Sequence, residues 1–364
     1  MKIVFVVEHF YPYVGGAEEL FLNLCKFLAD LGYDVRVVTT LHSDSLKKHE
    51  EYDGIKIYRV PCKNRFLFTI LSFPEVFKQS KNADFIHTTS YNSAIPAFFA
   101  GLIRRTKVLI TFHEVWGKLW FKLPFYPKWK LTGFYLFEWL ILKLPFYRYI
   151  AVSESTRDAL VKHGVQESRI EQIYNGLAYE PLKNFHYDPP KNFTFCFYGR
   201  LGISKGIDIL IPASAQFIKY YPEVRLKLII PTYPESLFFK VTELIKASKI
   251  EDNLILLHDL SREELLAQVS SSTCIIIPSQ SEGFCYVAVE SAAMGVPIIS
   301  SGKGALAETV SGKHLTIKCL NIQSVFEALK KAMNNEWEYS ELKKFSLEES
   351  TKRYLSLYSS NRHT

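Results

Sequence analysis

The chain has 364 residues, of which 48% are hydrophobic and 22% charged, and its formal net charge is +7. This length exceeds what one hydrophobic core usually fills, so we expect two domains, and the composition excludes an extensively disordered chain. Six scattered cysteines form no Cys-x-x-Cys pair, which argues against a disulfide framework and favours a reducing, cytoplasmic compartment.

In the first half, short β-rich runs alternate with helical patterns. Residues 2–8 are predicted as the first strand, because their apolar stretch is too short for a signal peptide. A helix is predicted over 17–31, after the pair Gly15-Gly16. The further strands of this half are predicted at 35–40, 107–113 and 149–153. Such alternation indicates a parallel sheet covered by helices on both faces.

A second series of strands follows a polar segment. Residues 177–192 carry three prolines and are predicted as a linker. We therefore expect an α/β protein with doubly wound domains at 1–180 and 190–338, and a carboxy-terminal helix within 340–364, where a helical pattern runs over 341–358. The strands of the second domain are predicted at 193–198, 224–230, 254–257, 274–277, 296–300 and 315–318.

The segment after the predicted strand 274–277 carries the strongest chemical pattern. Glu282 and Glu290 lie eight positions apart across a glycine turn at Gly283 and the start of a helix. Helix starts attract anions through their first amide groups, and glycine lets a ligand approach the backbone closely. The pattern therefore favours a phosphate-bearing ligand, although two glutamates near a helix start could also simply cap it.

Two further loops offer groups that suit an anion. Arg200 and Lys205 follow the predicted strand 193–198, so both can converge on a diphosphate and stabilise it as a leaving group without a metal ion. Gly15 and Gly16 separate the first strand from the first helix, where their amides are available to an anion. The alternatives are solvated surface bases at the first loop and a tight structural turn at the second.

These motifs together resemble glycosyltransferase family 4, the retaining GT-B enzymes with a Glu-x7-Glu signature. Pro278-Ser279, Glu282-Gly283-Phe284 and Glu290 match that signature, and the resemblance covers residues 1 to about 335. It is also carried by 11–18, Ala151-Val152-Ser153-Glu154-Ser155, Asn175-Gly176, Gly199-Arg200 and Lys205-Gly206. The resemblance implies two Rossmann-like domains facing a central cleft, with an acceptor-binding first domain, a donor-binding second domain and the carboxy-terminal helix packed back on the first.

The resemblance also implies roles for individual residues. Glu282 would meet hydroxyls of the donor sugar, Glu290 the nucleotide ribose, and His113 the donor sugar or the reacting hydroxyl; a packing role is the alternative for His113. The implied catalytic residues are Glu282, His113, Arg200 and Lys205. The implied donor-binding residues are Gly15, Gly16, Arg200, Lys205, Glu282, Gly283, Phe284, Cys285, Tyr286 and Glu290. No Asp-x-Asp motif occurs, so we expect neither a metal nor a cofactor besides the nucleoside diphosphate sugar that serves as donor.

Basic and aromatic residues interleave between 116 and 149. Residues 101–150 contain nine Lys or Arg against two Glu, together with four of the five tryptophans. The apolar run 131–142 is too short to cross a bilayer, which takes roughly 20 residues, so we expect peripheral contact with an anionic membrane surface. Nucleic acid is a competing partner that we do not expect, and the aromatic residues could instead belong to the core.

The expected activity is transfer of a hexose from a nucleoside diphosphate sugar to a hydroxyl of a lipid-linked or membrane-proximal glycan, with retention and without metal. The sequence identifies neither the sugar, the nucleotide base, the acceptor nor the linkage. Two alternatives stay open: a GT-B sugar epimerase, and a noncatalytic glycan- or membrane-binding module that retains the nucleotide cleft. The expected location is the cytoplasm or the cytoplasmic face of the membrane.

Overall fold

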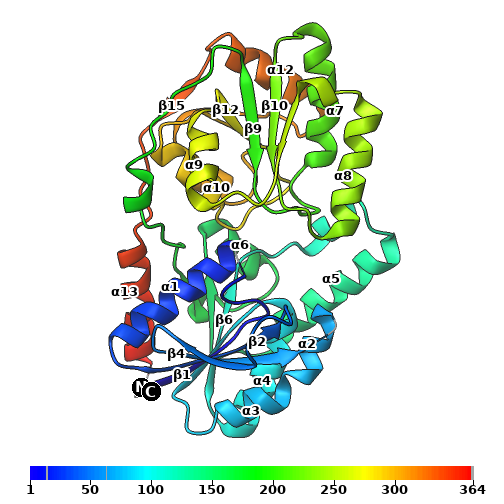
Figure 1. Cartoon of the computed structure of the whole chain (residues 1–364). Helices are drawn as coiled ribbons and strands as arrows, with labels where there is room; N and C mark the ends of the chain where they lie inside the picture. Colours follow the sequence, from blue (N-terminus) through cyan, green and yellow to red (C-terminus); the bar gives the residue numbers. More distant parts are fainter. Residues whose placement is uncertain (14, 63, 362–364) are drawn as a thin grey trace. The chain divides into compact units, whose positions relative to one another are not determined.

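A computed structural model describes residues 1–13, 15–62 and 64–361 of the chain. These residues form two compact units. Unit 1 contains Met1–Phe121, Lys128–Gly176 and the carboxy-terminal segment from Ser346, and unit 2 contains Lys122–Pro127 and Leu177–Phe345. Each unit is an α/β domain built on its own sheet (Figure 1).

The described strands of unit 1 form an eight-stranded sheet in the order β3-β4-β2-β1-β5-β6-β7-β8. All neighbours are parallel except β3 and β4, which pair as an antiparallel hairpin. The strands are β1 (Lys2–Val6), β2 (Asp34–Leu41), β3 (His49–Tyr52), β4 (Ile55–Pro61), β5 (Phe85–Thr89), β6 (Lys107–Phe112), β7 (Arg148–Ala151) and β8 (Ile170–Gln172).

Helices of unit 1 cover this sheet and bury its apolar side chains, such as Val4, Ile86 and Ile110, in one core. Parallel neighbours need crossover connections, which explains why helices alternate with the strands. The helices are α1 (Gly16–Asp30), α2 (Arg65–Leu71), α3 (Phe73–Gln79), α4 (Ala94–Arg104), α5 (Lys128–Lys143), α6 (Glu154–Lys162) and α13 (Leu347–Ser360), with short 3-10 turns η1 (Tyr91–Ser93), η2 (Gly117–Lys122) and η3 (Glu167–Arg169).

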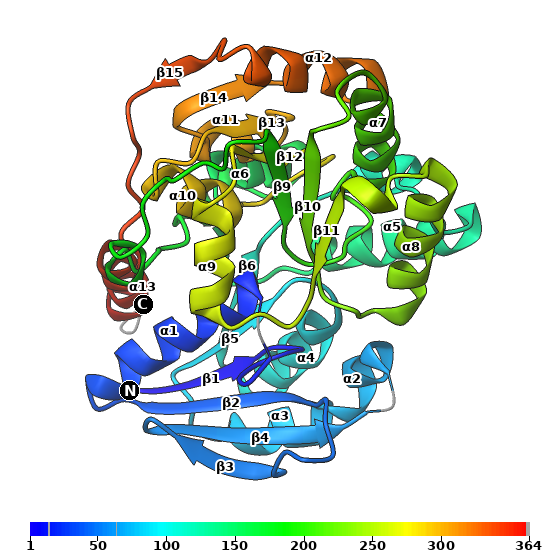
Figure 2. The same ribbon diagram turned by 45° about the horizontal axis from the view of Figure 1, so that its top comes forward.

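The last helix, α13, belongs to unit 1 and lies beside α1 (Figures 1 and 2). Its Tyr358 hydroxyl bonds the buried ring of His87 in β5, whose other ring nitrogen lies 2.8 Å from the Thr111 hydroxyl. Burial of the imidazole lowers the pKa of His87 to about 3. The neutral ring thus joins the end of the chain to the centre of the first sheet.

The described strands of unit 2 form a seven-stranded sheet in the order β11-β10-β9-β12-β13-β14-β15. Only β15 is antiparallel to its neighbour. The strands are β9 (Thr194–Tyr198), β10 (Arg225–Ile229), β11 (Leu254–Leu257), β12 (Cys274–Ile277), β13 (Ile298–Ser300), β14 (Gly312–Thr316) and β15 (Glu338–Ser340).

Two helices of unit 2 begin with a side-chain cap. Ser261 and Glu264 form a reciprocal capping box at the start of α9, and the Asn321 side chain caps α12. Phe217, Leu228 and Leu329 pack in the core of this unit. The helices are α7 (Ile207–Tyr220), α8 (Glu235–Ser248), α9 (Arg262–Ser270), α10 (Tyr286–Ala293), α11 (Leu306–Thr309) and α12 (Ile322–Met333), with 3-10 turns η4 (Glu180–Leu182) and η5 (Glu251–Asn253).

The predicted fold class is confirmed; most observed bounds lie within one or two residues of the predicted ones, and two elements differ more. The strand expected at 315–318 is β14, which begins at Gly312 because its first residues pair with β15. The helix expected from 341 starts at Leu347, where the Ser346 side chain accepts a hydrogen bond from the Glu349 amide. Residues 338–340 form a strand instead, and β15, the hairpin β3–β4, β5 and β8 were not predicted.

Candidate active site

Glu282 lies in the loop between β12 and α10 in unit 2, and it is already ion-paired. Its side chain is 8% exposed, and the Lys205 ammonium lies 2.7 Å from Oε1 and 2.8 Å from Oε2. The Ser279 hydroxyl donates to Oε1 at 2.6 Å. A buried carboxylate needs such partners, and these contacts hold the Glu282 side chain in one orientation.

Lys205 reaches Glu282 because two loops at the same sheet edge are joined through their backbones. Gly206 has φ +70°, and a Cβ there would lie 1.9 Å from the Pro278 carbonyl oxygen, so only glycine fits. The Gln280 amide also donates to the Ser204 carbonyl at 2.6 Å. The loop after β9 is thereby held against the loop after β12, with Lys205 facing Glu282.

A third loop closes on the backbone of Glu282. The Ala305 amide donates to the Glu282 carbonyl at 2.8 Å, and Gly304, with φ +61°, would place a Cβ only 2.4 Å from the same oxygen. The end of the loop between β13 and α11 therefore holds the backbone of Glu282. Glycine is required at 304 for this approach.

Glu290 lies within α10, is 6% exposed, and has partners on both carboxylate oxygens. Arg262, the first residue of α9, forms an ion pair with Oε1, and the Tyr198 hydroxyl donates to Oε2 at 3.3 Å. Figures 1 and 2 show α9 and α10 side by side. Burial raises the pKa of Tyr198 well above its ordinary value, and the Glu290 charge adds to this, so the phenol remains a donor.

The start of α10 has the features of an anion site. Its N-cap Cys285 adopts φ +72° and makes no side-chain cap hydrogen bond. Burial raises the pKa of the Cys285 thiol well above its ordinary value, so this thiol stays protonated. Phe284 packs edge-on against Tyr286, with ring centroids 5.1 Å apart. The helix dipole and the first amides of α10 are therefore available to complement a negative charge.

The structure brings together most of the predicted residues of unit 2. Lys205 and Glu282 are in contact, Gly283 to Tyr286 connect Glu282 to α10, and Glu290 lies one turn along that helix. Arg200 lies on the same loop as Lys205, just after Gly199 with its φ of +137°, and its side chain is exposed. These residues meet at the carboxyl ends of β9 and β12, where parallel α/β sheets bind ligands.

The predicted residues of unit 1 lie at the corresponding edge of the first sheet. Gly15 is the N-cap of α1, with extended backbone, and Gly16 is the first residue of that helix. His113 follows β6, and its ring lies edge-on to Phe21 of α1, with centroids 6.2 Å apart. The Thr156 hydroxyl donates to the His113 carbonyl at 3.3 Å. His113 is therefore packed against α1.

Three residues that contact Glu282 or Glu290 could not be assigned a role from the sequence. Ser279 lies inside the motif, and only the fold shows that its hydroxyl holds Glu282. Tyr198 and Arg262 come from β9 and α9, more than 25 positions away from Glu290. The Ser-x-x-Glu pattern at 261–264 signals a helix start after β11, and that was the one available sign that Arg262 lies at this edge.

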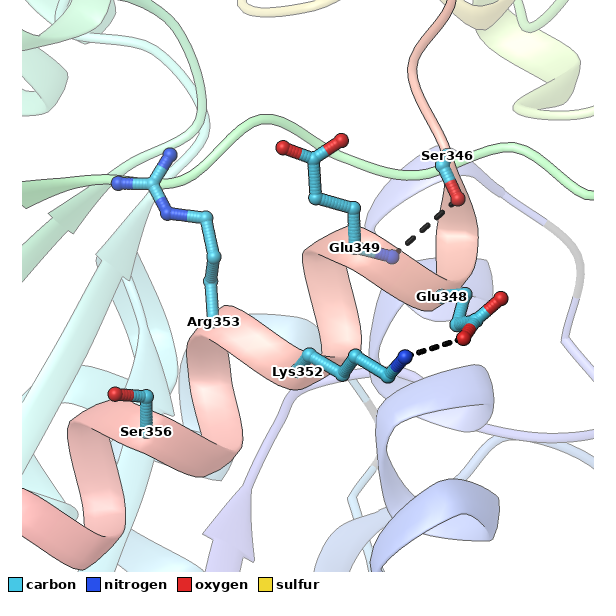
Figure 3. Close-up of a pocket in the computed structure, with 6 residues that line it drawn as sticks. All are labelled: Ser346, Glu348, Glu349, Lys352, Arg353 and Ser356. Atoms are coloured by element: carbon cyan, nitrogen blue, oxygen red, sulfur yellow. Dashed lines mark hydrogen bonds and ion pairs between the residues drawn. The ribbon is translucent and has the colours of Figure 1, made fainter.

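A hollow on α13 is a weaker candidate. It is lined by Ser346, Glu348, Glu349, Lys352, Arg353 and Ser356 (Figure 3). Glu348 pairs with Lys352 one turn along the helix, which is ordinary surface chemistry. None of the predicted site residues lines this hollow. In the described parts of the chain, no group of three or more His, Cys, Asp or Glu side chains is placed to hold a metal ion.

Two family models match the chain in succession. The model "Glycosyltransferase Family 4" matches residues 14–180, and the model "Glycosyl transferases group 1" matches residues 180–348. The junction falls in the segment predicted as a linker.

Curated relatives span most of the chain. A GDP-mannose:cellobiosyl-diphosphopolyprenol alpha-mannosyltransferase from Xanthomonas oryzae is 27% identical over 82% of this chain and 78% of its own length. The phosphatidylinositol N-acetylglucosaminyltransferase gpi3 subunit from Schizosaccharomyces pombe is 25% identical over 85% of this chain and 68% of its own length.

Solved structures share the fold. Sucrose-phosphate synthase from Thermosynechococcus elongatus superposes with a TM-score of 0.81 at 20% identity, covering 99% of this chain and 98% of that one. Anabaena HepE in complex with UDP-glucose gives a TM-score of 0.76 at 17% identity, covering 99% and 100%. With both family models, the two α/β units and these neighbours in agreement, the chain belongs to glycosyltransferase family 4 and is a glycosyltransferase of the GT-B fold.

Proposed function

We propose that this glycosyltransferase moves a hexose from a nucleoside diphosphate sugar to a hydroxyl of a lipid-linked glycan, with retention of configuration and without a metal ion. The observation that carries the donor half is the pairing of both signature acids, Glu282 with Lys205 and Glu290 with Arg262, around the start of α10. The arrangement combines fixed carboxylates for hydroxyls with cations and amides for phosphates.

In this proposal each group of unit 2 takes one part of the donor. Glu282 accepts hydrogen bonds from the sugar hydroxyls, and Glu290 accepts them from the ribose. Arg200, Lys205 and the first amides of α10 stabilise the negative charge that develops on the departing diphosphate. Lys205 then bridges the acid that grips the sugar and the leaving group, which aligns the anomeric carbon for attack.

Unit 1 would supply the other reactants. His113 is proposed to meet the donor sugar or the attacking hydroxyl, and the Gly15-Gly16 turn at the start of α1 to approach the donor phosphate or acceptor. Retention of configuration is implied by the Glu-x7-Glu resemblance. It is tested by the anomeric proton coupling of the first-formed product, since an inverting enzyme would give the opposite anomer.

The proposal of a membrane-borne acceptor rests on the surface formed by α2, α4, η2 and α5 of unit 1. More than half of the large apolar side chains exposed in the described residues lie on these four elements. Helix α2 contacts α4, Phe66 of α2 stacks on Phe134 of α5 with centroids 6.1 Å apart, and the ring centroid of Phe121 of η2 lies 5.3 Å from that of Tyr135 of α5. The exposed apolar side chains are Phe66, Leu67, Ile70, Leu71, Phe99, Leu102, Ile103, Phe121, Trp129, Leu136, Trp139 and Leu140.

Charge on α5 complements an anionic surface. Lys128, Lys130 and Lys143 are exposed at its two ends. Its single acid, Glu138, is 2% exposed and accepts hydrogen bonds from the Trp116 amide, the Gly117 amide, the Trp120 indole and the Tyr91 hydroxyl. The outer face of α5 is therefore apolar and basic, which suits a membrane interface containing anionic lipid.

The relatives agree with a lipid-borne acceptor. The names of the Xanthomonas and Schizosaccharomyces proteins refer to a diphosphopolyprenol and to phosphatidylinositol. No helix in the described parts of the chain is both long and apolar enough to cross a bilayer. We therefore propose peripheral docking on the cytoplasmic face, and the six unbridged cysteines fit a reducing compartment.

A donor screen tests the enzymatic half of the proposal. UDP, GDP and ADP sugars are incubated with the wild type, Glu290→Ala and Arg200→Ala, and release of the nucleoside diphosphate is measured. We expect release by the wild type with at least one donor. Arg200→Ala should lose a hundredfold or more, typical of removing an electrostatic transition-state contact, and Glu290→Ala should lose release because its donor binding is weakened. A noncatalytic binding module would release nothing, and a sugar epimerase would change the sugar without needing an acceptor.

Vesicle sedimentation tests the membrane half. Vesicles with 30% anionic lipid are compared with neutral vesicles, using the wild type, the double variant Trp129→Glu and Trp139→Glu, and Phe239→Glu as a matched exposed aromatic on unit 2. We expect binding to anionic vesicles that the double variant loses and the control keeps. Equal binding by all three proteins, or binding to duplex DNA in preference to vesicles, would contradict this part of the proposal.

A further inference from the structure

Arg262 is a charged residue of unit 2 that contacts a signature acid without belonging to any motif. It is the first residue of α9, and its position is fixed by the capping box of Ser261 and Glu264. Its guanidinium pairs with Oε1 of Glu290 while the side chain remains 48% exposed. The contact is therefore reachable by a ligand, although the carboxylate itself is buried.

Two partners of Glu290 approach from different elements. Arg262 holds Oε1 from α9, and the Tyr198 hydroxyl, 3.3 Å from Oε2, holds the other oxygen from the end of β9. The single proton of the Tyr198 hydroxyl is shared between Glu290 Oε2 and the Val287 carbonyl, which lies 3.1 Å away, and the Ser291 hydroxyl lies at 3.2 Å. The ion pair with Arg262 is therefore the stronger of these two contacts, and it restricts rotation of the carboxylate about its terminal bond before any donor arrives.

The arrangement does not block a ligand from Glu290. The two oxygens of a carboxylate offer about four acceptor positions in all. An oxygen that already accepts from Arg262 or from Tyr198 can accept from a second donor. The two neighbouring hydroxyls of a ribose suit these acceptor positions, because each hydroxyl can donate to one carboxylate oxygen.

We propose that Arg262 is a positioning residue for the donor, which holds the Glu290 carboxylate in the one plane that receives both ribose hydroxyls. The inference rests on the proposed function, in which Glu290 binds the ribose, and adds that discrimination between ribose and deoxyribose depends on Arg262. Removal of the guanidinium frees the carboxylate to turn, so the hydrogen bonds to the hydroxyls weaken while the rest of the nucleotide is still bound.

The test is a double-mutant cycle in which one change removes a protein side chain and the other removes the 2′-hydroxyl of the nucleotide. UDP, GDP and ADP are titrated calorimetrically, each beside its 2′-deoxy counterpart, into the full chain. The proteins are the wild type, Arg262→Ala, Arg262→Lys and Glu290→Ala. Arg225→Ala serves as the control, because Arg225 is an exposed arginine at the amino end of β10, the opposite edge of the sheet. For each protein, the readout is the ratio of its affinities for the ribonucleotide and for the 2′-deoxy counterpart. A general loss of positive charge weakens both affinities equally, so it does not change this ratio.

We expect the wild type and Arg225→Ala to prefer the ribonucleotide about tenfold, the value of one hydrogen bond to a charged group. Arg262→Ala should reduce the preference to about two- or threefold, and Arg262→Lys should restore part of it. If Arg262→Ala keeps the full preference while Glu290→Ala loses it, the inference fails and the proposed function stands. If Glu290→Ala also keeps the preference, or no nucleotide binds, the proposed function fails and takes the inference with it.

Discussion

Substitution of Lys205 by Met should destabilise unit 2 more than substitution of its partner Glu282 by Gln. Lys205→Met leaves a carboxylate that is 8% exposed with the Ser279 hydroxyl as its remaining described side-chain partner. Loss of one partner of a buried pair costs about 3–5 kcal/mol. Because the Lys205 side chain is 26% exposed and admits water, we expect the lower end, about 3 kcal/mol.

Glu282→Gln has a smaller effect, because the ammonium that remains can turn toward water. We expect a loss of about 1.5 kcal/mol, the lower end of the range for a hydrogen bond to a charged group. The double variant should lose only about 2 kcal/mol, since it leaves no buried charge behind, and the coupling between the two sites is then about 2.5 kcal/mol.

The assay is urea unfolding monitored by hydrogen exchange in peptides covering residues 274–293. These peptides report unit 2 alone, whereas four of the five tryptophans lie in unit 1. Lys219→Met, at an exposed lysine of α7, is the matched control and should change the free energy of unfolding by less than about 0.5 kcal/mol. Additive effects of the two substitutions, or a milder effect of Lys205→Met than of Glu282→Gln, would refute the reasoning.

Three further predictions concern particular buried groups. The pKa of folded His87 is about 3 and that of an unfolded histidine is 6.5, so the unfolded state binds more protons between these pH values. Between pH 7 and pH 5, the free energy of unfolding should therefore fall by about 2 kcal/mol more in the wild type than in His87→Gln. Parallel curves of unfolding free energy against pH would contradict this. Glu138→Gln should destabilise unit 1 by at least about 2 kcal/mol in urea, because two buried donors meet an amide that cannot accept them. Gly206→Ala, whose Cβ would lie 1.9 Å from the Pro278 oxygen, should lower the melting temperature far more than Gly32→Ala, which has φ +80° and nothing within 4 Å; equal losses would show that backbone conformation alone accounts for the cost.

The sequence was sufficient to predict the fold because strand and helix patterns alternate regularly and the motifs follow the strands. Strands at 254–257 and 274–277 were predicted with their observed bounds. The edge strands β3 and β15 were missed because they are short and mostly exposed or half-buried, so they lack the apolar run that identifies a buried strand. Their pairing is decided by neighbouring strands. Strand β4 does alternate buried and half-buried positions, and β5 is buried, so the pattern of these two could have been recognised.

The site was predicted only as far as the motif extends along the chain. Glu282, Lys205 and Glu290 could be named because glycines and prolines around them mark a strand, a turn and a helix start. Tyr198 and Arg262 could not, because their contacts with Glu290 depend on how α9 and β9 pack against α10. A long-range ion pair leaves no periodic or local signal in one sequence.

A crystal structure with an intact nucleoside diphosphate sugar tests the central claim most directly. The account predicts the pyrophosphate within hydrogen-bond distance of Arg200 and the first amides of α10, the ribose hydroxyls on Glu290, and the sugar hydroxyls on Glu282. A donor bound away from the carboxyl ends of β9 and β12, or one that contacts neither acid, would contradict the account.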